Sequence, residues 1–188
     1  MRRLAFALFV ALSLTSCGSS PKTEFFALTA VAGSPAQRMA VKPIQVVSVH
    51  IPADLDRQEM VWRGQGQSLT VSDQNRWGAP LDEMIERVLT EDLASRLPRG
   101  SVVLPQQAAP QDSRTLVLDI LEFEDDGNGK VVFDGSWSLT SRGASSPEAG
   151  ETLKLSAPAK SGDAASEAQA MSTIVGQLAD RIVAKIPR

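Results

Sequence analysis

The 188-residue sequence has very few of the residues from which covalent and metal-based sites are built. It contains one cysteine, one histidine and no tyrosine. A single cysteine cannot close an intramolecular disulfide, so the fold must rest on packing alone. The one histidine, His50, excludes metal sites built from several histidines, and we interpret it as a surface or strand-end residue. We therefore expect no bound metal and no cofactor.

Sequence patterns for catalysis and nucleic-acid binding are missing as well. There is no Gly-x-Ser-x-Gly elbow, no phosphate-binding loop and no Gly-x-Gly-x-x-Gly fingerprint. The formal net charge is −3 without a basic run, which argues against nucleic acid as a partner. No apolar run reaches the roughly 20 residues of a membrane-spanning helix. These absences predict a protein that is not an enzyme.

The N-terminal residues, in contrast, have the organisation of an export signal. Arg2 and Arg3 precede eleven apolar residues, 4–14, too few to span a bilayer. The run leads into Leu-Thr-Ser-Cys at 14–17, which resembles a bacterial lipobox: an aliphatic residue, two small residues and a cysteine. By that resemblance residues 1–16 are a lipoprotein signal peptide, and Cys17 is lipidated. The alternative is an incidental cysteine in a signal peptide or short membrane anchor.

Lipidation at Cys17 carries an expectation about location. Two or more acyl chains hold a protein firmly at a membrane. Gly18 stands where an aspartate would indicate retention at the inner membrane, so by analogy we expect the outer membrane, with the domain on the periplasmic face. The tether 18–23 reaches at most about 20 Å, so the first strand should lie on the membrane-proximal side. Without residues 1–16, the chain has 17 basic and 22 acidic residues, a formal charge of −5.

Beyond the lipidated cysteine and tether at 17–23, residues 24–187 are predicted to form one α+β domain, an α/β sandwich. Helical spacing of apolar residues predicts helices over 80–97 and 163–186. Apolar and β-branched segments predict seven strands, over 24–28, 41–51, 59–63, 68–72, 114–124, 130–141 and 151–155. We expect a mostly antiparallel sheet packed against two amphipathic helices.

Two acidic groups have both a functional and a structural interpretation. Residues 124–129 resemble the first half of a calcium loop, but Gly135 falls where a bidentate glutamate is needed. We favour a hairpin turn with solvated acids. The second group lies opposite the apolar stripe of the first helix and is interpreted as a solvated face, not an acid–base site: Asp82, Glu83, Glu86, Glu91 and Asp92.

Trp77 is placed in a loop just before the first helix. A large aromatic residue there either packs against the start of the helix or marks a contact surface. We favour packing and expect the Trp77 ring to be largely buried. Trp137 alternates with polar residues into the core pattern of its strand and is interpreted as structural.

Several segments together resemble a known family. Apart from the lipobox they are EFFALT, VSVHIPADLDRQEMVWR, NRWGAPLDEMIERVLTEDLASRLP and LEFEDDGNGKVVFDGSWSL. The most specific part is Asn75-x-Trp77-x-x-Pro80-Leu81. From about residue 24 to 187 the chain resembles the PqiC/YmbA family of ABC-type transport auxiliary lipoproteins. This family often has tyrosine in the first strand, where this chain has Phe25-Phe26.

The resemblance implies a non-enzymatic accessory subunit of a transport system that contains mammalian-cell-entry (MCE) domains. Such systems are thought to move lipids or other hydrophobic molecules between the two membranes and to support envelope integrity. The lipoprotein would be the outer-membrane end, and an MCE protein anchored in the inner membrane would be its partner. A homo-oligomer around that partner is a further expectation. Contacts are expected in the 75–81 motif, in the region 65–76 or in the loop 141–150.

Two other functions stay open. A solitary periplasmic lipid carrier would need an apolar pocket of roughly several hundred Å³ between sheet and helices. A docking module would instead have a filled core and an exposed contact patch. The other alternative is an envelope-assembly lipoprotein, which would be recovered with components of an assembly machine.

Overall fold

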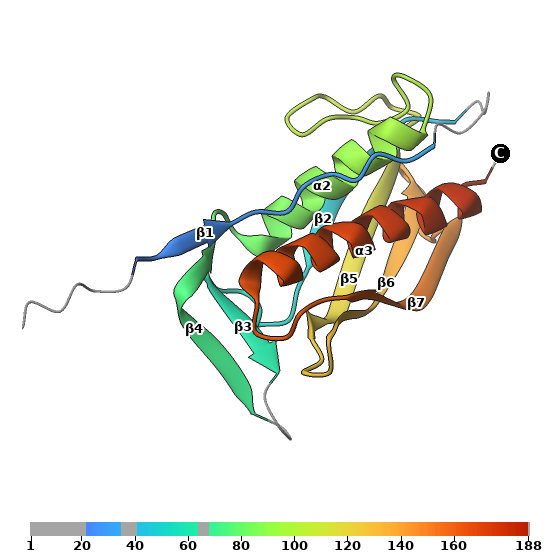
Figure 1. Cartoon of the computed structure of the whole chain (residues 1–188). Coiled ribbons are helices and arrows are strands. Elements are labelled where there is room, and N and C mark those ends of the chain that lie inside the picture. Colours follow the sequence, from blue (N-terminus) through green and yellow to red (C-terminus); the bar gives the residue numbers. More distant parts are fainter. Residues whose placement is uncertain (1–21, 35–40, 64–67, 188) are drawn as a thin grey trace, which may run out of the picture.

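The computed structural model describes residues 22–34, 41–63 and 68–187, in which two helices lie on one face of a seven-stranded sheet (Figure 1). Cys17 and most of the tether lie outside the described residues. The elements are β1 (Glu24–Phe26), β2 (Ile44–His50), β3 (Glu59–Arg63), β4 (Leu69–Trp77), α2 (Leu81–Arg96), β5 (Arg114–Asp125), β6 (Lys130–Ser141), β7 (Ala149–Pro158) and α3 (Ala164–Lys185). All seven expected strands and both expected helices are therefore present.

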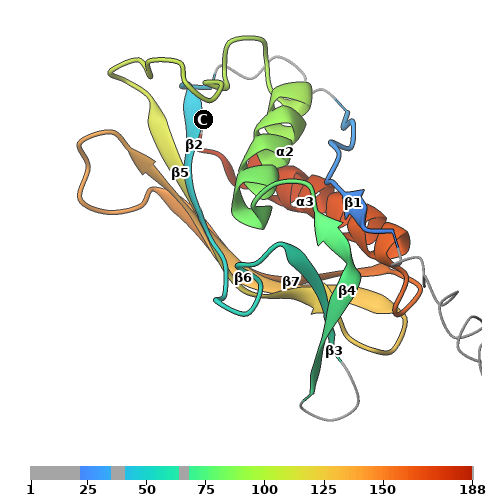
Figure 2. The same ribbon diagram turned by 90° about the vertical axis from the view of Figure 1, so that its left-hand side faces the viewer.

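The sheet is mixed, so the expectation of a mostly antiparallel sheet is wrong, although the α+β class is confirmed. The strand order is β1-β4-β3-β5-β6-β7, and β2 pairs with β5. The pairs β1·β4, β2·β5 and β3·β5 are parallel, and the other three are antiparallel. The cause is visible in Figure 2: α2 follows the β3–β4 hairpin and carries the chain back, so that β5 starts level with β2. A parallel pair requires a crossover of this kind.

Element boundaries differ from the prediction mainly around Trp77. This residue ends β4, which is longer than the expected 68–72, so its assignment to a loop is wrong. α2 begins at Leu81, directly after Pro80, and α3 begins at Ala164. The Asp163 side chain caps α3 by accepting a hydrogen bond from the Ser166 N–H at 2.9 Å.

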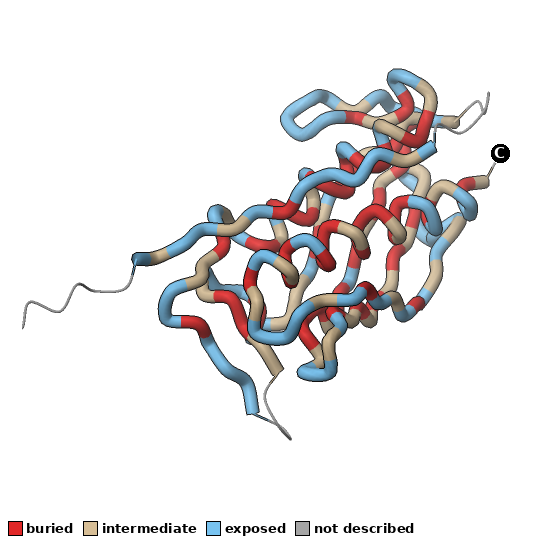
Figure 3. The backbone as a smooth tube through the Cα atoms, in the orientation of Figure 1, coloured by how far each residue is buried: buried red, intermediate tan, exposed pale blue. Residues whose placement is uncertain are grey.

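The core lies between the two helices and the facing side of the sheet. Figure 3 shows the buried residues alternating along the strands and recurring on the inner faces of the helices. The rings of Phe123 and Phe133 meet edge to face, with centroids 5.4 Å apart. Gly135 lies beside the register shift of the β5–β6 pair, where a Cβ would come within 2.6 Å of the Asp119 carbonyl oxygen. Side chains less than 2 % exposed include Ile85, Leu89, Leu116, Leu118, Leu139 and Leu178.

A segment at the N-terminal side, residues 27–34, runs over both helices and is called the strap below (Figure 1). Leu28 is buried, and its carbonyl oxygen accepts a hydrogen bond from Arg87 at 2.9 Å. The Thr29 N–H donates to Ser172 of α3, and the Val31 N–H donates to Asp92 of α2. The strap thereby ties β1 to the two helices.

Candidate functional site

The Asn75–Leu81 motif forms the junction between β4 and α2. Trp77 and Leu81 are buried, each 3 % exposed, which confirms the burial predicted for Trp77. The Trp77 N–H donates to the Gln58 carbonyl oxygen at 2.7 Å, and Trp77 pairs with Phe26 of β1. Asn75 is half-buried and Pro80 is exposed. A contact between this motif and a partner stays a prediction, and Pro80 and Asn75 are its accessible members.

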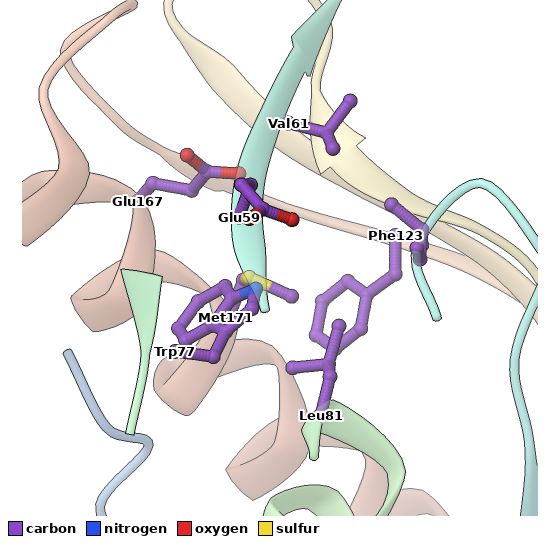
Figure 4. A pocket seen from close by; sticks show the side chains of 8 residues that line it. Glu59, Val61, Trp77, Leu81, Phe123, Glu167 and Met171 are labelled. Atoms are coloured by element: carbon purple, nitrogen blue, oxygen red, sulfur yellow. The ribbon is translucent and has the colours of Figure 1, made fainter. Parts of the chain in front are cut away.

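Beside this junction lies a small cavity between β3, β5 and α3 (Figure 4). Its free volume is about 10 Å³, barely the space of one water molecule. Trp77, Leu81, Phe123 and Met171 form apolar walls, while Glu167 carries a carboxyl group into the site. The remaining lining residues are Leu55, Glu59 and Val61.

Glu167 is the most perturbed ionisable residue of this region. It is 3 % exposed, and its Oε2 atom has no hydrogen-bond partner among the described residues. Burial raises the pKa of Glu167 to about 8, the charges of Asp125 and Glu124 add to the effect, and the Trp62 side chain opposes it. The carboxyl group is thus mostly protonated at neutral pH.

Stability should therefore fall as the pH rises from about 4.5 to about 8. Between the unfolded pKa near 4.5 and the folded pKa near 8, the folded state binds more protons than the unfolded state. Each pH unit in that window then costs up to about 1.4 kcal/mol of unfolding free energy. Glu167→Gln should be clearly more stable than the wild type at pH 9 and nearly equal to it at pH 5. Urea unfolding of both proteins at the two pH values measures this. An equal difference in unfolding free energy between variant and wild type at pH 5 and pH 9 would contradict it.

The acids of the β5–β6 turn were expected to be solvated, and this is wrong for Glu124 and Asp125. Glu124 and Asp125 are 3 % and 1 % exposed. Glu124 forms an ion pair with Arg63, and Asp125 accepts hydrogen bonds from the Gly127 and Gly162 N–H groups and from Ser161. The segment leading into α3 folds over Asp125, whereas Glu124 lies against Arg63 of β3. The hairpin turn itself is confirmed, and no group of metal-ligating side chains was found in the described part of the chain.

The predicted solvated face of α2 is wrong at one position, Asp92. This residue is 0 % exposed, and burial raises its pKa, although the Val31 N–H and Arg96 act in the opposite direction. Arg96, 3 % exposed, donates to Asp180 at 2.6 Å, to the Val31 carbonyl oxygen at 2.9 Å and to the Gly176 carbonyl oxygen at 3.1 Å. The Asp92–Arg96 pair therefore joins α2, α3 and the strap.

His50 lies at the exposed end of β2, as expected. Its Nδ1 atom is 2.7 Å from Asp119 Oδ1, and its Nε2 atom is 2.7 Å from Ser48 Oγ. The order serine–histidine–aspartate is that of a nucleophilic hydrolase site. However, the His50 and Asp119 side chains are 63 % and 51 % exposed. They line neither the small cavity beside Trp77 nor the two surface hollows of the next paragraph. We interpret the group as a polar surface cluster.

Two open hollows lie on the surface of the described part of the chain. The first, about 330 Å³, lies where α2 ends and is lined by Pro98, Arg99, Val102 and Leu104 among others. The second, about 390 Å³, lies on the sheet face away from the helices, and the ion pair Lys154–Asp134 crosses it. Both have charged side chains in their walls and are open to solvent. They differ from the enclosed apolar chamber that a lipid carrier needs.

Residues 26–183 match the family model described as the ABC-type transport auxiliary lipoprotein component. The chain belongs to this family. Its resemblance to the PqiC/YmbA lipoproteins is thereby confirmed. None of the helices in the described residues is long and apolar enough to cross a membrane. Cys17 precedes the matched residues, so its lipidation stays a prediction.

Two relatives of this auxiliary lipoprotein domain are named as intermembrane transport lipoproteins. The intermembrane transport lipoprotein PqiC of Escherichia coli K12 is 27 % identical over 136 residues, which cover 71 % of this chain and 72 % of the relative. The protein of the same name from Shigella flexneri gives the same values.

Solved structures share the fold of this auxiliary lipoprotein domain. A crystal structure of an uncharacterized protein has a TM-score of 0.71 at 19 % identity and covers 87 % of this chain and 98 % of the other. A second, from Xanthomonas campestris, has a TM-score of 0.69 at 20 % identity and covers 85 % and 92 %. At these identities the likeness establishes the fold alone.

Proposed function

We propose that this protein is a non-enzymatic accessory subunit of an MCE-type intermembrane transport system. It is anchored in the outer membrane through Cys17, faces the periplasm and supports envelope integrity by helping to move lipids or other hydrophobic molecules. The observation that carries this proposal is the family match over residues 26–183. The printed name of the Escherichia coli relative, an intermembrane transport lipoprotein, supports it.

The interior of the domain favours docking over solitary lipid carriage. A carrier would hold an acyl chain between sheet and helices, in a pocket of roughly 300 Å³ or more. The cavity that the described residues form there is about 10 Å³. The core residues around it, such as Phe123 and Met171, are each 1 % exposed. The solitary carrier therefore stays the second candidate.

The size of the domain requires a partner for transport between membranes. The tether reaches at most about 20 Å, and α3, with 22 residues, is about 33 Å long. A domain of these dimensions at the outer membrane does not cross the periplasm. An MCE protein anchored in the inner membrane would supply the span, and a ring of several copies would enclose its end.

Lipidation is tested by replacing Cys17 with serine. Wild-type cells supplied with labelled palmitate should incorporate the label and retain the protein in the outer-membrane fraction. Cys17→Ser removes the sulfur that the lipobox chemistry requires, so we expect no label and either uncleaved or soluble periplasmic protein. Palmitate in the Cys17→Ser protein would overturn the assignment.

The transport function is tested by crosslinking in intact cells. A photo-crosslinking residue replaces Ser145 in the exposed β6–β7 loop, or Pro80, and Thr152 on the exposed side of β7 serves as the comparison position. We expect an MCE-domain protein to be captured from Ser145 or Pro80. Recovery of assembly-machine components would favour the envelope-assembly alternative. Recovery of an uncrosslinked monomer, with unchanged detergent tolerance after deletion, would favour the solitary carrier.

A further inference from the structure

The N-terminal end of the domain has an unusual distribution of apolar residues. Phe25 of β1 is 63 % exposed, and Leu69 and Val71 of β4 are each 41 % exposed. β1 pairs with the last three residues of β4, and both strands lie at the end of the molecule where α2 and α3 begin (Figures 1 and 2). Figure 3 shows an exposed run along this edge. We call the edge formed by 22–26 and 69–74 the proximal edge.

We propose that the proximal edge rests on the lipid surface of the membrane that holds the anchor, with Phe25, Leu69 and Val71 in contact with it. This inference rests on the lipid anchor of the proposed function and adds to it an orientation of the domain. Loop 98–113, which follows the C-terminal end of α2, would then point away from the membrane (Figure 1).

The first argument is the position of the anchor. Only six residues, 18–23, separate Cys17 from β1, and they reach at most about 20 Å. Glu24 must therefore lie within that distance of the membrane. The opposite end of the domain is about 33 Å further along α3. Of the two ends, the proximal edge is the one that the tether always holds near lipid.

The second argument is that the tether alone would leave the domain free to turn, and exposed apolar groups remove this freedom. Single apolar residues scattered on a surface are ordinary. Phe25 differs because it lies two residues after the tether, where transfer into the interface costs almost no further loss of freedom. Aromatic side chains favour the interfacial region of a bilayer, and aliphatic groups beside them add to binding.

The third argument is that part of the backbone edge of β4 is uncovered. β1 covers the outer side of β4 at Asn75, Arg76 and Trp77, but in the described residues no strand pairs with the outer side of 69–74. The charged residues of the edge are Lys22, Glu24 and Asp73, a formal net charge of −1. Arg76 next to the edge is paired with Glu59 at 3.5 Å. Apolar contact thus decides the interaction, without a preference for anionic lipid.

The test uses introduced thiols in the acylated, full-length protein. If the sulfur of Cys17 is acylated, Phe25→Cys, Val71→Cys and Leu104→Cys each carry the one free thiol of the chain. Leu104 is a matched control, because it is 46 % exposed but belongs to loop 98–113. Each variant is labelled with an environment-sensitive fluorophore and reconstituted into phosphatidylethanolamine–phosphatidylglycerol vesicles. Some of the vesicles contain a nitroxide-bearing quencher lipid.

On vesicles, we expect the emission of the fluorophore at positions 25 and 71 to shift to shorter wavelength and to be quenched by the quencher lipid. The fluorophore at position 104 should keep the emission wavelength that it has in water and should not be quenched. Adding Phe25→Ser to Val71→Cys should reduce the quenching at position 71, since Phe25 holds the edge down. If the protein binds vesicles but all three positions behave alike, the orientation is overturned while the anchor stands. A shift without vesicles that grows with protein concentration would assign the edge to a second copy and overturn the proposal. If the purified protein carries no lipid, both the anchor and the orientation fall.

Discussion

Replacing Arg96 with methionine is expected to lower the free energy of unfolding by about 3 to 5 kcal/mol, as when one partner of a buried ion pair is removed. Arg96 and Asp92 are 3 % and 0 % exposed. Without the guanidinium group, the Asp92 carboxylate keeps only the hydrogen bond from the Val31 N–H, at 2.7 Å, among the donors named here. The Gly176 carbonyl oxygen loses its charged hydrogen-bond donor. Methionine retains much of the arginine stem, so the loss measures the charge and its hydrogen bonds.

Arg87→Met on the same helix is the control. Its side chain is 47 % exposed, pairs with Glu91 and donates to the Leu28 carbonyl oxygen. Exposed pairs and single hydrogen bonds of this kind contribute about 1 kcal/mol. Adding Asp92→Asn to Arg96→Met should restore part of the loss, because no uncompensated carboxylate is then buried. Urea unfolding with equal losses for Arg96→Met and Arg87→Met would refute this account of the network.

The sequence allowed the elements to be predicted because each leaves a local pattern. The apolar stripe of α2, the alternation from Val131 to Leu139 and the turn residues Asn128-Gly129 are all read within a few residues. Strand pairing is not local. Whether β5 returns parallel to β2 depends on how α2 crosses the sheet, and no short segment encodes that crossing. The β5–β6 hairpin was therefore predicted, and the parallel pairs were missed.

Buried charges were missed for a related reason. Asp92 was expected opposite the apolar stripe of α2, but it follows the buried Val88 and Leu89 by four and three residues and so lies at the margin of that stripe. Val31 of the strap, 61 residues away in sequence, lies over it. Glu167 is buried by β3 and the end of β5, both far from it in the chain. The i, i+4 spacing of Asp92 and Arg96 was an available signal, but the same spacing occurs in exposed helical pairs. Trp77 was correctly expected to be buried because it lies near the start of α2, where Leu81 is a local neighbour; Phe123 and Met171, which line the same cavity, are distant in sequence.

Trp77→Ala is expected to cost about 3 to 5 kcal/mol of unfolding free energy, the usual range for truncating a buried tryptophan. The ring is 3 % exposed and lines the small cavity together with Leu81, Phe123 and Met171 (Figure 4). The adjoining cavity holds barely one water molecule, so the neighbours have little room to relax into the space left. Trp77→Phe keeps an aromatic ring at the site and should lose less. Urea unfolding followed by far-ultraviolet circular dichroism measures both, without relying on tryptophan fluorescence.

Phe25→Ala provides the contrast, because Phe25 lies next to the same β1–β4 pairing but is 63 % exposed. Truncation of an exposed residue changes stability by about 0.5 kcal/mol or less. Phe25→Ala should thus leave folding intact and act, if at all, on the membrane contact of the proximal edge. Trp77→Ala should loosen the junction between β4 and α2, through which β1 and the tether are joined to the core. If both variants unfold at the same urea concentration, Trp77 is not a packing residue and belongs with the partner contacts instead.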